Sequence, residues 1–170
     1  MKARRSVAIC CSLLLLPIVL LATYMAAKGK DSDKYVCSES NPQGMCSAST
    51  TCGSASAPCV VDIKRTASAA SVTPSIAGAK ENAPFCITVG TKVTFKSVSK
   101  NVGFVLDFGP SSPFDQGTIM GGSDRPITTV AKKPGCYKFS AGACVSGAIY
   151  GMCGDTSAEI IVNRRRQLNN

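Results

Sequence analysis

Cysteine is the residue type in this chain that could do the most chemistry, because the sequence holds 10 cysteines and no histidine among 170 residues. Cys10 and Cys11 lie in an apolar N-terminal run. The others are Cys37, Cys46, Cys52, Cys59, Cys86, Cys136, Cys144 and Cys153. An even number of cysteines behind an export signal predicts four disulfides. The usual structural zinc sites are not expected, since the sequence offers neither histidine nor a Cys-x-x-Cys pair.

The N-terminal segment predicts export. Lys2, Arg4 and Arg5 precede an uncharged, mainly apolar stretch over residues 6–27. Basic residues followed by an apolar run and then a polar region are typical of a secretory signal, and this run is also long enough to span a bilayer. The small residues that a signal peptidase prefers fit no cut near Ala27 well. Residues 1–27 are therefore either a cleaved signal peptide or an uncleaved anchor in the membrane, and the rest of the chain is periplasmic or extracellular.

The formal net charge is +9, and part of this excess lies in the N-terminal segment and in a basic tail over residues 164–170. We interpret the tail as a solvated end of the chain. The basic residues show no aromatic interleaving and no binding motif, so a nucleic-acid partner is not expected. The partner that the composition leaves open is an unknown protein or another component of the cell envelope.

The pattern of apolar residues predicts one β domain. Residues 28–58 read as a charged spacer and a Cys-rich cap that has too few large apolar residues to bury a core of its own. Residues 59–163 hold short alternating segments separated by turn residues, which is typical of a Greek-key β-sandwich of seven or eight strands. The expected strands are 60–65, 85–89, 92–98, 104–108, 126–130, 136–140 and 158–162. Residues 66–83 are expected to be a loop or an irregular edge of the sheet, and the glycine-rich residues 117–125 a loop.

Several of these segments resemble, in order, the cupredoxin family, of which plastocyanin is a member. Residues 87–95 (Ile-Thr-Val-Gly-Thr-Lys-Val-Thr-Phe) resemble its first strand pair. Residues 133–139 (Lys-Pro-Gly-Cys-Tyr-Lys-Phe) resemble the strand that enters its metal loop, and Gly151-Met152 with residues 159–162 resembles its final segment. Residues 104–108 fall where the family has its first metal-binding strand. The resemblance implies a cupredoxin-type sandwich over residues 59–163.

The copper ligands of that family do not carry over. A blue-copper site takes two imidazoles, one thiolate and a weak axial thioether. The first imidazole position falls within residues 104–107, the thiolate position falls on Ala141, and the second imidazole position falls on or near Cys144. Only Met152 matches, as the axial ligand. The resemblance therefore implies a domain without a type 1 copper site, and no cofactor is expected. The alternative is Cu(I) binding by Cys144, Met152 and Cys153, because thiolates and thioethers suit that ion.

The same cysteines have a structural interpretation. A Cys144–Cys153 disulfide would close the loop that metal ties down in the family, and would stabilise the fold by about 2–3 kcal/mol. Cys136 is expected to point away from the face of Tyr137 and to pair with Cys86 or Cys59. Cys37, Cys46, Cys52 and Cys59 can pair among themselves, or one or more of them can pair with the rest of the domain, and spacing does not decide between these pairings.

The sequence predicts a protein that is not an enzyme. Without histidine the usual general base is missing, and there is no phosphate-binding loop, dinucleotide fingerprint or nucleophile elbow. Loops on a rigid sandwich often carry recognition. We therefore expect a non-catalytic binding or structural module that uses residues 109–124 and 141–155 as its contact surface.

Overall fold

The computed structural model describes residues 33–54, 56–145 and 153–164. The chain divides into two units, Met1–Lys34 and Tyr35–Asn170, and all described residues except Asp33 and Lys34 belong to the second. The predicted signal peptide or anchor over residues 1–27, with its apolar helix, lies outside the described residues. Within the part of the chain that the structure describes, no helix combines the length and the apolar character needed to cross a membrane.

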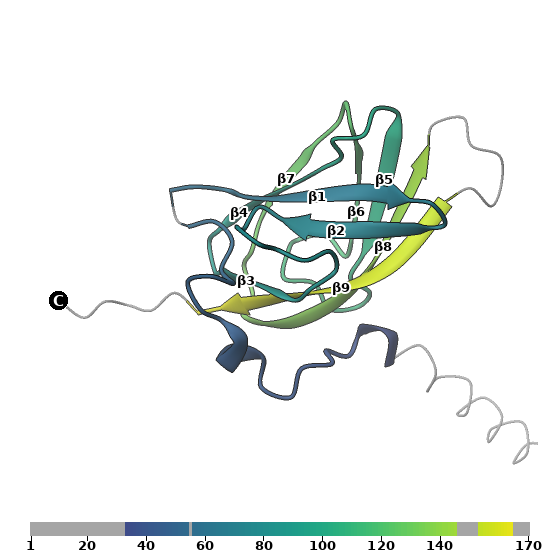
Figure 1. The fold of residues 1–170 in the computed structure, drawn as a ribbon. Coiled ribbons are helices and arrows are strands. Elements are labelled where there is room, and N and C mark those ends of the chain that lie inside the picture. Colours follow the sequence, from purple (N-terminus) through teal and green to yellow (C-terminus); the bar gives the residue numbers. More distant parts are fainter. Residues whose placement is uncertain (1–32, 55, 146–152, 165–170) are drawn as a thin grey trace, which may run out of the picture. The chain divides into compact units, whose positions relative to one another are not determined.

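The described residues form a nearly all-β fold (Figure 1). Two 3₁₀ turns, η1 (Asp33–Tyr35) and η2 (Pro42–Met45), precede the strands. The nine strands of this part of the chain are β1 (Cys59–Thr66), β2 (Ala69–Pro74), β3 (Phe85–Thr88), β4 (Lys92–Lys96), β5 (Val102–Asp107), β6 (Thr118–Gly122), β7 (Ile127–Val130), β8 (Gly135–Val145) and β9 (Cys153–Asn163).

The strands run in the order β6-β5-β8-β9-β2-β1-β4-β7, with β3 pairing β9 from outside this path. One half of the sandwich is β2-β1-β4-β7, and the other is β6-β5-β8-β9 with β3. β1 lies parallel to β4, and β3 lies parallel to β9, so strands distant in sequence are neighbours in both halves. This arrangement is the predicted Greek-key sandwich of cupredoxin type, with one strand more than the seven or eight expected.

Alternating burial explains how the two halves pack. Val61 and Ile63 of β1, like Val93 and Phe95 of β4, are fully buried, while their neighbours in sequence are not. The inner faces meet over a cluster of aromatic rings. The Phe108 ring stacks on the Phe139 ring at 4.6 Å between centroids, and Phe114 contacts Phe108 and Phe95 edge to face. Burying rings of this size contributes much of the stability of a domain.

Two strands lie where the sequence predicts loops. β2 is rich in small residues and β6 ends in Gly121 and Gly122, so neither has the apolar alternation that marks a strand in isolation. β2 is held by six paired positions on β1, and β6 by five on β5. An added Cβ at Gly121 would lie 2.6 Å from the Phe104 ring. The glycine is therefore needed for β6 to pack closely, although glycine disfavours a strand in isolation.

The hairpin of β8 and β9 is longer than predicted. Its register continues from Gly135↔Val162 to Cys144↔Cys153, well beyond the expected strands 136–140 and 158–162. The two halves of the sandwich also meet along β9, at the pair Ala69↔Asp155. A Cβ at Gly154 would lie 2.1 Å from the Ala69 carbonyl oxygen. Only glycine at this position allows β2 to approach β9 so closely.

Candidate functional site

The outer face of the β6-β5-β8-β9 half gathers most of the candidate residues in rows across the sheet. One row is Gly122, Gly103, Cys144 and Cys153, and the next is Met120, Val105, Gly142 and Asp155. A third row is Thr118, Asp107, Ser140 and Ser157. Further along β8 and β9, Lys138 faces Glu159 and Cys136 faces Ile161. The expectation that Cys136 points away from Tyr137 agrees with this alternation.

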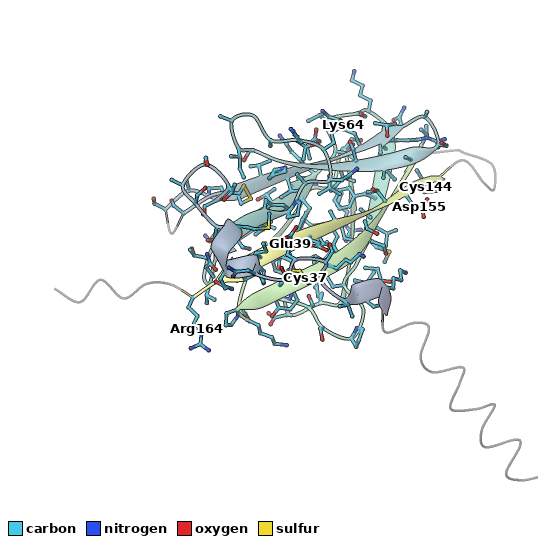
Figure 2. All side chains as sticks on the ribbon, turned by 60° about the horizontal axis from the view of Figure 1, so that its bottom comes forward. Cys37, Glu39, Lys64, Cys144, Asp155 and Arg164 are labelled. Atoms are coloured by element: carbon cyan, nitrogen blue, oxygen red, sulfur yellow. A yellow bond between two sulfur atoms is a disulfide. The ribbon has the colours of Figure 1, made fainter. Side chains whose placement is uncertain are left out.

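Residues 35–46, hereafter the strap, cross one end of this face (Figure 1). Disulfides join Cys37 to Cys136 on β8 and Cys46 to Cys86 on β3. The Tyr35 hydroxyl donates a hydrogen bond of 2.6 Å to Asp107 Oδ2. Figure 2 shows Cys37 over the sheet, while Cys144 lies at the far end of the hairpin. We call the part of the face beneath the strap the covered end, and the part with the first two rows the open end.

The strap corrects the expected pairing of Cys136. Its partner is Cys37 and not Cys86 or Cys59. Cys86 pairs with Cys46, and Cys59 with Cys52. All three cysteines of the cap thus bond to the domain, Cys52 to its first residue over a separation of 7 residues. The sequence left this open because pairing across the sheet depends on which strands are neighbours, and the spacing of cysteines does not contain that information.

Glu159 is the carboxylate that the sequence analysis missed. Its side chain is buried, at 5% exposure. The Ser38 backbone N–H donates to Glu159 Oε1 at 2.8 Å, and the Ser38 hydroxyl donates a short hydrogen bond to the same oxygen. Glu159 Oε2 lies 3.4 Å from Cys37 Sγ. The available signal was a single acid inside the apolar run Ala-Glu-Ile-Ile-Val, because a buried charge needs partners.

The Cys37 and Cys136 sulfurs and a Glu159 carboxylate oxygen all lie within 4.8 Å of one another. A cavity of about 330 Å³ opens beside them and is lined by Ser38, Glu39, Asn82, Pro84, Lys138, Ser157, Ala158 and Glu159. The cluster combines two soft sulfur atoms with one hard oxygen, a mixed set that suits borderline metal ions when the sulfurs are thiolates.

Tyr137 follows Cys136 on β8 and packs against the core on the opposite, inner face of the sheet. The Tyr137 hydroxyl donates a hydrogen bond that is shared between the carbonyl oxygens of Lys133 and Pro134, each at 3.2 Å. Gly135, at φ +148°, leaves room for the ring, since a Cβ there would lie 3.2 Å from the Tyr137 hydroxyl. Burial disfavours the phenolate and raises the pKa of Tyr137 above its ordinary value of 10.0.

The open end presents apolar side chains to solvent. Met120 is 69% exposed and Val105 37%. Met120 and Val105 face each other directly on β6 and β5. Val105 lies over Gly142, where a Cβ would meet Val105 Cγ1 at 3.1 Å. The glycines of these rows leave the surface flat around the exposed side chains.

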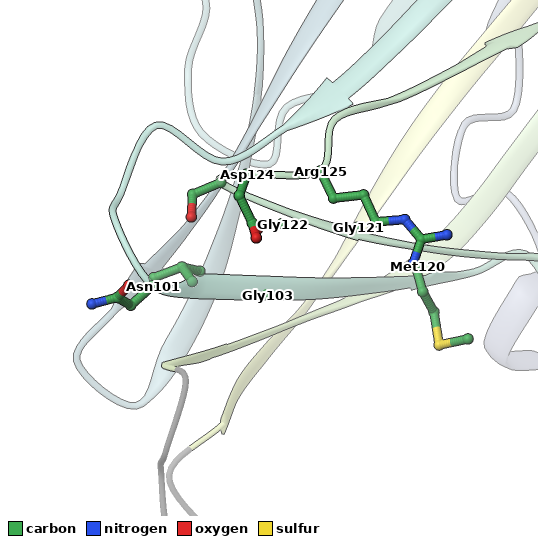
Figure 3. Close-up of a pocket in the computed structure, with 9 residues that line it drawn as sticks. Asn101, Gly103, Met120, Gly121, Gly122, Asp124 and Arg125 are labelled. Carbon is green, nitrogen blue, oxygen red and sulfur yellow. The ribbon is translucent and has the colours of Figure 1, made fainter.

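A cavity of about 400 Å³ adjoins Met120 (Figure 3). Its lining comes from the start of β5 and from the end of β6 with the turn that follows: Asn101, Val102, Gly103, Met120, Gly121, Gly122, Ser123, Asp124 and Arg125. In Figure 3, the Met120 and Arg125 side chains lie at one end, and those of Asn101 and Asp124 at the other. Residues 117–125 are thus a strand and a turn that shape a cavity, and not the loop that was expected.

The two expected contact loops have different outcomes. The N-terminal part of residues 109–124 belongs to the core, because Phe114 is buried between Phe95 and Phe108. The C-terminal part, as β6, and the end of β8 flank β5 on its two sides, since Gly103 pairs with both Gly122 and Cys144. The tip of the β8–β9 hairpin, within the second expected contact loop, lies outside the described residues.

The positions that the cupredoxin resemblance assigns to copper ligands lie inside the sheet. Ala141, at the thiolate position, pairs with Leu106 on β5, within the segment that holds the first imidazole position. Both side chains have 0% exposure. Cys144, at or near the second imidazole position, is bonded to Cys153. Met152, the expected axial ligand, lies outside the described residues. Neither Leu106 nor Ala141 carries an atom that can bind a metal.

The Cys144–Cys153 disulfide joins directly opposed positions of the ladder, with 4.3 Å between their Cα atoms. It therefore crosslinks the ends of β8 and β9, and the pairing of Cys144 with Cys153 is as the sequence predicts. Residues 146–152, most of the segment that this bond encloses, lie outside the described residues. Cys153 is exposed and Cys144 half-buried, so this disulfide forms part of the open end.

No protein-family model and no curated protein matches the sequence. Among solved structures, an oxidized mutant of amicyanin has 12% identity and a TM-score of 0.35, covering 68% of this chain and 95% of its own. A reduced Cu(I) form of another amicyanin mutant at pH 4 has 11% identity and a TM-score of 0.37, covering 76% and 99%. A heme-copper terminal oxidase dimer has a chain with 18% identity and a TM-score of 0.30, covering 89% and 97%. The sandwich assignment rests on the strand order and register given above.

Proposed function

We propose that this chain is an exported, non-catalytic binding module built on a cupredoxin-like sandwich without a type 1 copper site. The missing copper site is supported by the donor set, because the sequence holds no histidine and the thiolate position falls on the buried, apolar Ala141. Export is supported by the N-terminal apolar run and by four disulfides among the eight cysteines of the described residues. Disulfides in this number are typical of oxidising compartments.

The single observation that carries a binding role is the exposed pair of Met120 and Val105 on a flat, glycine-rich sheet face. Contiguous exposed apolar area on a soluble domain usually marks an interaction site. Methionine is well suited to such a surface, since its flexible thioether adapts to different partners. The adjoining cavity of about 400 Å³ would receive a side chain of the partner.

The partner that this surface fits is an extended apolar segment of another protein, added as a strand along β6. The Ser123 N–H donates to the Val102 carbonyl, and the Phe108 N–H to the Gly117 carbonyl. These bonds show which residue pairs of the β5–β6 ladder are hydrogen-bonded and which are not. With this alternation, the residues at 119 and 121 bond to β5, and the backbone N–H and C=O of Met120 point away from it. Among the described residues β6 pairs only with β5. The same residue thus offers an apolar side chain and edge backbone groups, as strand addition requires.

A site-specific crosslinker tests this surface. A photo-reactive residue at Val105 in the full chain, expressed in its own host, should form an adduct with a partner protein. The same probe at Val98, which is 58% exposed, should not. Met120→Pro removes the edge N–H without touching the ladder to β5, and should reduce the adduct at least about tenfold, whereas Met120→Leu should keep it. Equal adducts at both probe positions, or an adduct insensitive to Met120→Pro, would contradict the proposal.

Copper handling by Cys144, Met152 and Cys153 is the competing function, and it requires free thiols at two cysteines that are bonded in the structure. Copper titration of the full chain under oxidising and reducing conditions separates the two. The binding-module proposal expects no tight binding in the oxidised protein and no loss of partner adducts on copper removal. Tight Cu(I) binding that disappears in the Cys144→Ser/Cys153→Ser variant would support copper handling instead.

The N-terminal segment decides whether the module is released or held at the membrane. We propose that residues 6–27 direct export in either case. N-terminal sequencing of the native protein distinguishes the two states, because a released protein begins after this segment and an anchored one retains Met1.

A further inference from the structure

We propose that Cys37, Cys136 and Glu159 form a Zn²⁺ site when the Cys37–Cys136 disulfide is reduced. This site lies at the covered end, apart from the copper positions of the cupredoxin resemblance and from the binding surface proposed above. It would make the attachment of the strap dependent on redox state and on metal.

The contact between Glu159 and Cys37 points to a state other than the disulfide. Glu159 Oε2 lies 3.4 Å from Cys37 Sγ. A sulfur in a disulfide has no hydrogen to donate, so this contact brings two acceptor atoms together in a buried place. It becomes favourable when Cys37 carries a proton or when a cation lies between the two atoms. Glu159 cannot turn to solvent, because its side chain is only 5% exposed.

The spacing of the donor atoms fits a tetrahedral ion. Zn²⁺ binds sulfur at about 2.3 Å and carboxylate oxygen at about 2.0–2.2 Å, so the sulfur and oxygen of two ligands lie about 3.6 Å apart. The observed 3.4 Å is close to this value. All three donor atoms lie within 4.8 Å of one another. Reduction breaks the bond between the two sulfurs, so they can move apart to the distance that separates two ligand atoms of the same tetrahedral ion.

The ligands are held by a supporting shell. Cys136 and Glu159 project from adjacent, paired strands, at positions two residues apart in register. Ser38 holds Glu159 Oε1 with its backbone N–H at 2.8 Å and with its hydroxyl, which leaves Oε2 aimed at Cys37. Outer partners of this kind orient metal ligands and raise metal affinity.

Charge and access agree with a divalent ion. Two thiolates and a carboxylate bring three negative charges, of which Zn²⁺ neutralises two. Lys138, which faces Glu159 in register and lines the same cavity, supplies the remaining positive charge. The cavity of about 330 Å³ gives the ion a path and leaves space for a water as the fourth ligand. A set with one carboxylate favours Zn²⁺ over Cu(I), which prefers sulfur alone.

The redox step needs a dithiol protein or small molecule as reductant. The dithiol gives two electrons and two protons to the Cys37–Cys136 bond, whose sulfurs become thiols, and is itself oxidised to a disulfide. Zn²⁺ binding then releases the two thiol protons. Cys37 and Cys136 are half-buried, whereas Cys52, Cys59 and Cys86 are at most 1% exposed. A mild dithiol therefore opens Cys37–Cys136 before the two disulfides that hold those buried cysteines.

The experiment uses the full chain with Cys144→Ser/Cys153→Ser, which removes the other accessible disulfide. Mild dithiol treatment, checked by differential alkylation and mass spectrometry, should free Cys37 and Cys136. The treated protein should then bind one Zn²⁺, measured against a chromogenic chelator, and Co²⁺ should give the absorption band of a thiolate-bound ion. The untreated protein should bind none.

Glu159→Gln keeps the disulfide and the shape of the side chain, so it should fold, and it should weaken Zn²⁺ binding by at least about tenfold. Ser38→Ala should weaken binding less. Adding Cys37→Ser and Cys136→Ser should abolish binding. Zn²⁺ affinity unchanged in Glu159→Gln, binding that persists without Cys37 and Cys136, or reduction of the buried disulfides before Cys37–Cys136 would each overturn the proposal.

Discussion

The covered and open ends of one sheet face differ although β8 and β9 run through both. On β9, Glu159 and Ile161 point to the outer face and are 5% and 0% exposed, whereas Cys153, Asp155 and Ser157 on that same face are exposed. The strand continues without a break between them. What differs is the strap, together with β3, which pairs with β9 only at residues 160–163 and is bonded to the strap through Cys46–Cys86. Burial on this face is thus set by a disulfide-bonded cover and not by the strand itself.

The difference also separates two kinds of chemistry. Polar and sulfur atoms gather beneath the strap, where a carboxylate can be buried because Ser38 and the strap backbone satisfy it. Apolar side chains gather at the open end, where Met120 and Val105 contact water. Stability should therefore depend on the covered end and recognition on the open end, and the following variants test this division.

The largest effect is expected from the disulfide that holds the strap. Cys37→Ser/Cys136→Ser should lower the free energy of unfolding by about 4 kcal/mol, because this disulfide closes the longest loop and the Cys46–Cys86 disulfide shortens that loop only in part. Cys144→Ser/Cys153→Ser should cost about 2.5 kcal/mol, since its loop spans 9 residues. Urea unfolding measures both. An equal or larger loss at the open end would break the comparison.

The next effect tests the buried carboxylate. Ser38→Ala removes one of the donors to Glu159 and should cost about 1–2 kcal/mol, because a buried acceptor loses a partner. Ser157→Ala is the matched control, because Ser157 lies on the same strand and face as Glu159 but is exposed. It should change the free energy of unfolding by less than about 0.5 kcal/mol. Equal effects in urea unfolding would mean that the strap does not set the energetics of this face.

A pH series tests the inner face behind the covered end, where Tyr137 packs against the core. Burial raises the pKa of Tyr137 above 10.0, so the unfolded chain loses this proton at lower pH than the folded chain does. The contribution of protonated Tyr137 to the free energy of unfolding is therefore complete below pH 10 and declines as the pH rises above it. Tyr137→Phe should remove this part of the decline and cost about 1 kcal/mol at neutral pH, through the lost hydrogen bond. A decline identical in both proteins would assign it to other groups.

The smallest effect on stability is expected at the open end. Met120→Thr replaces a side chain that is 69% exposed and should change the free energy of unfolding by less than about 0.5 kcal/mol. The same variant should lower the yield of the Val105 crosslink. A stability loss of several kcal/mol would show that Met120 packs as part of the fold and would remove the open end as a recognition surface.

The strands that could be predicted are those whose alternation is visible within their own residues. β1, β4 and the first part of β8 alternate between large apolar and polar residues, and they lie where the sequence places them. β2 and β6 lack that pattern. Their extended backbone depends on hydrogen bonds to β1 and β5, so only knowledge of the pairing could have found them.

The candidate site divides in the same way. Cys144 and Cys153 were paired from a short separation and a family loop, and the structure has them bonded. The cluster of Cys37, Cys136 and Glu159 joins residues about 100 positions apart, at separations of 99 and 122. Three-dimensional neighbours at that distance follow from the strand order and from the path of the strap. The apolar pair of Met120 and Val105 was hidden because β6 was not expected to be a strand.

The disulfide connectivity has a consequence for how the protein is made. Joining each cysteine to the next one along the chain would pair Cys37 with Cys46 and Cys86 with Cys136. The native bonds instead join Cys37 to Cys136 and, inside that loop, Cys46 to Cys86. During passage into an oxidising compartment from the N-terminus, Cys46 emerges near Cys37 long before Cys136 does. The cell must either delay oxidation until β8 has arrived or reshuffle an early bond. An early Cys37–Cys46 bond would have to be reshuffled by thiol–disulfide exchange, whereas Cys52–Cys59 and Cys144–Cys153 join successive cysteines and need no such step.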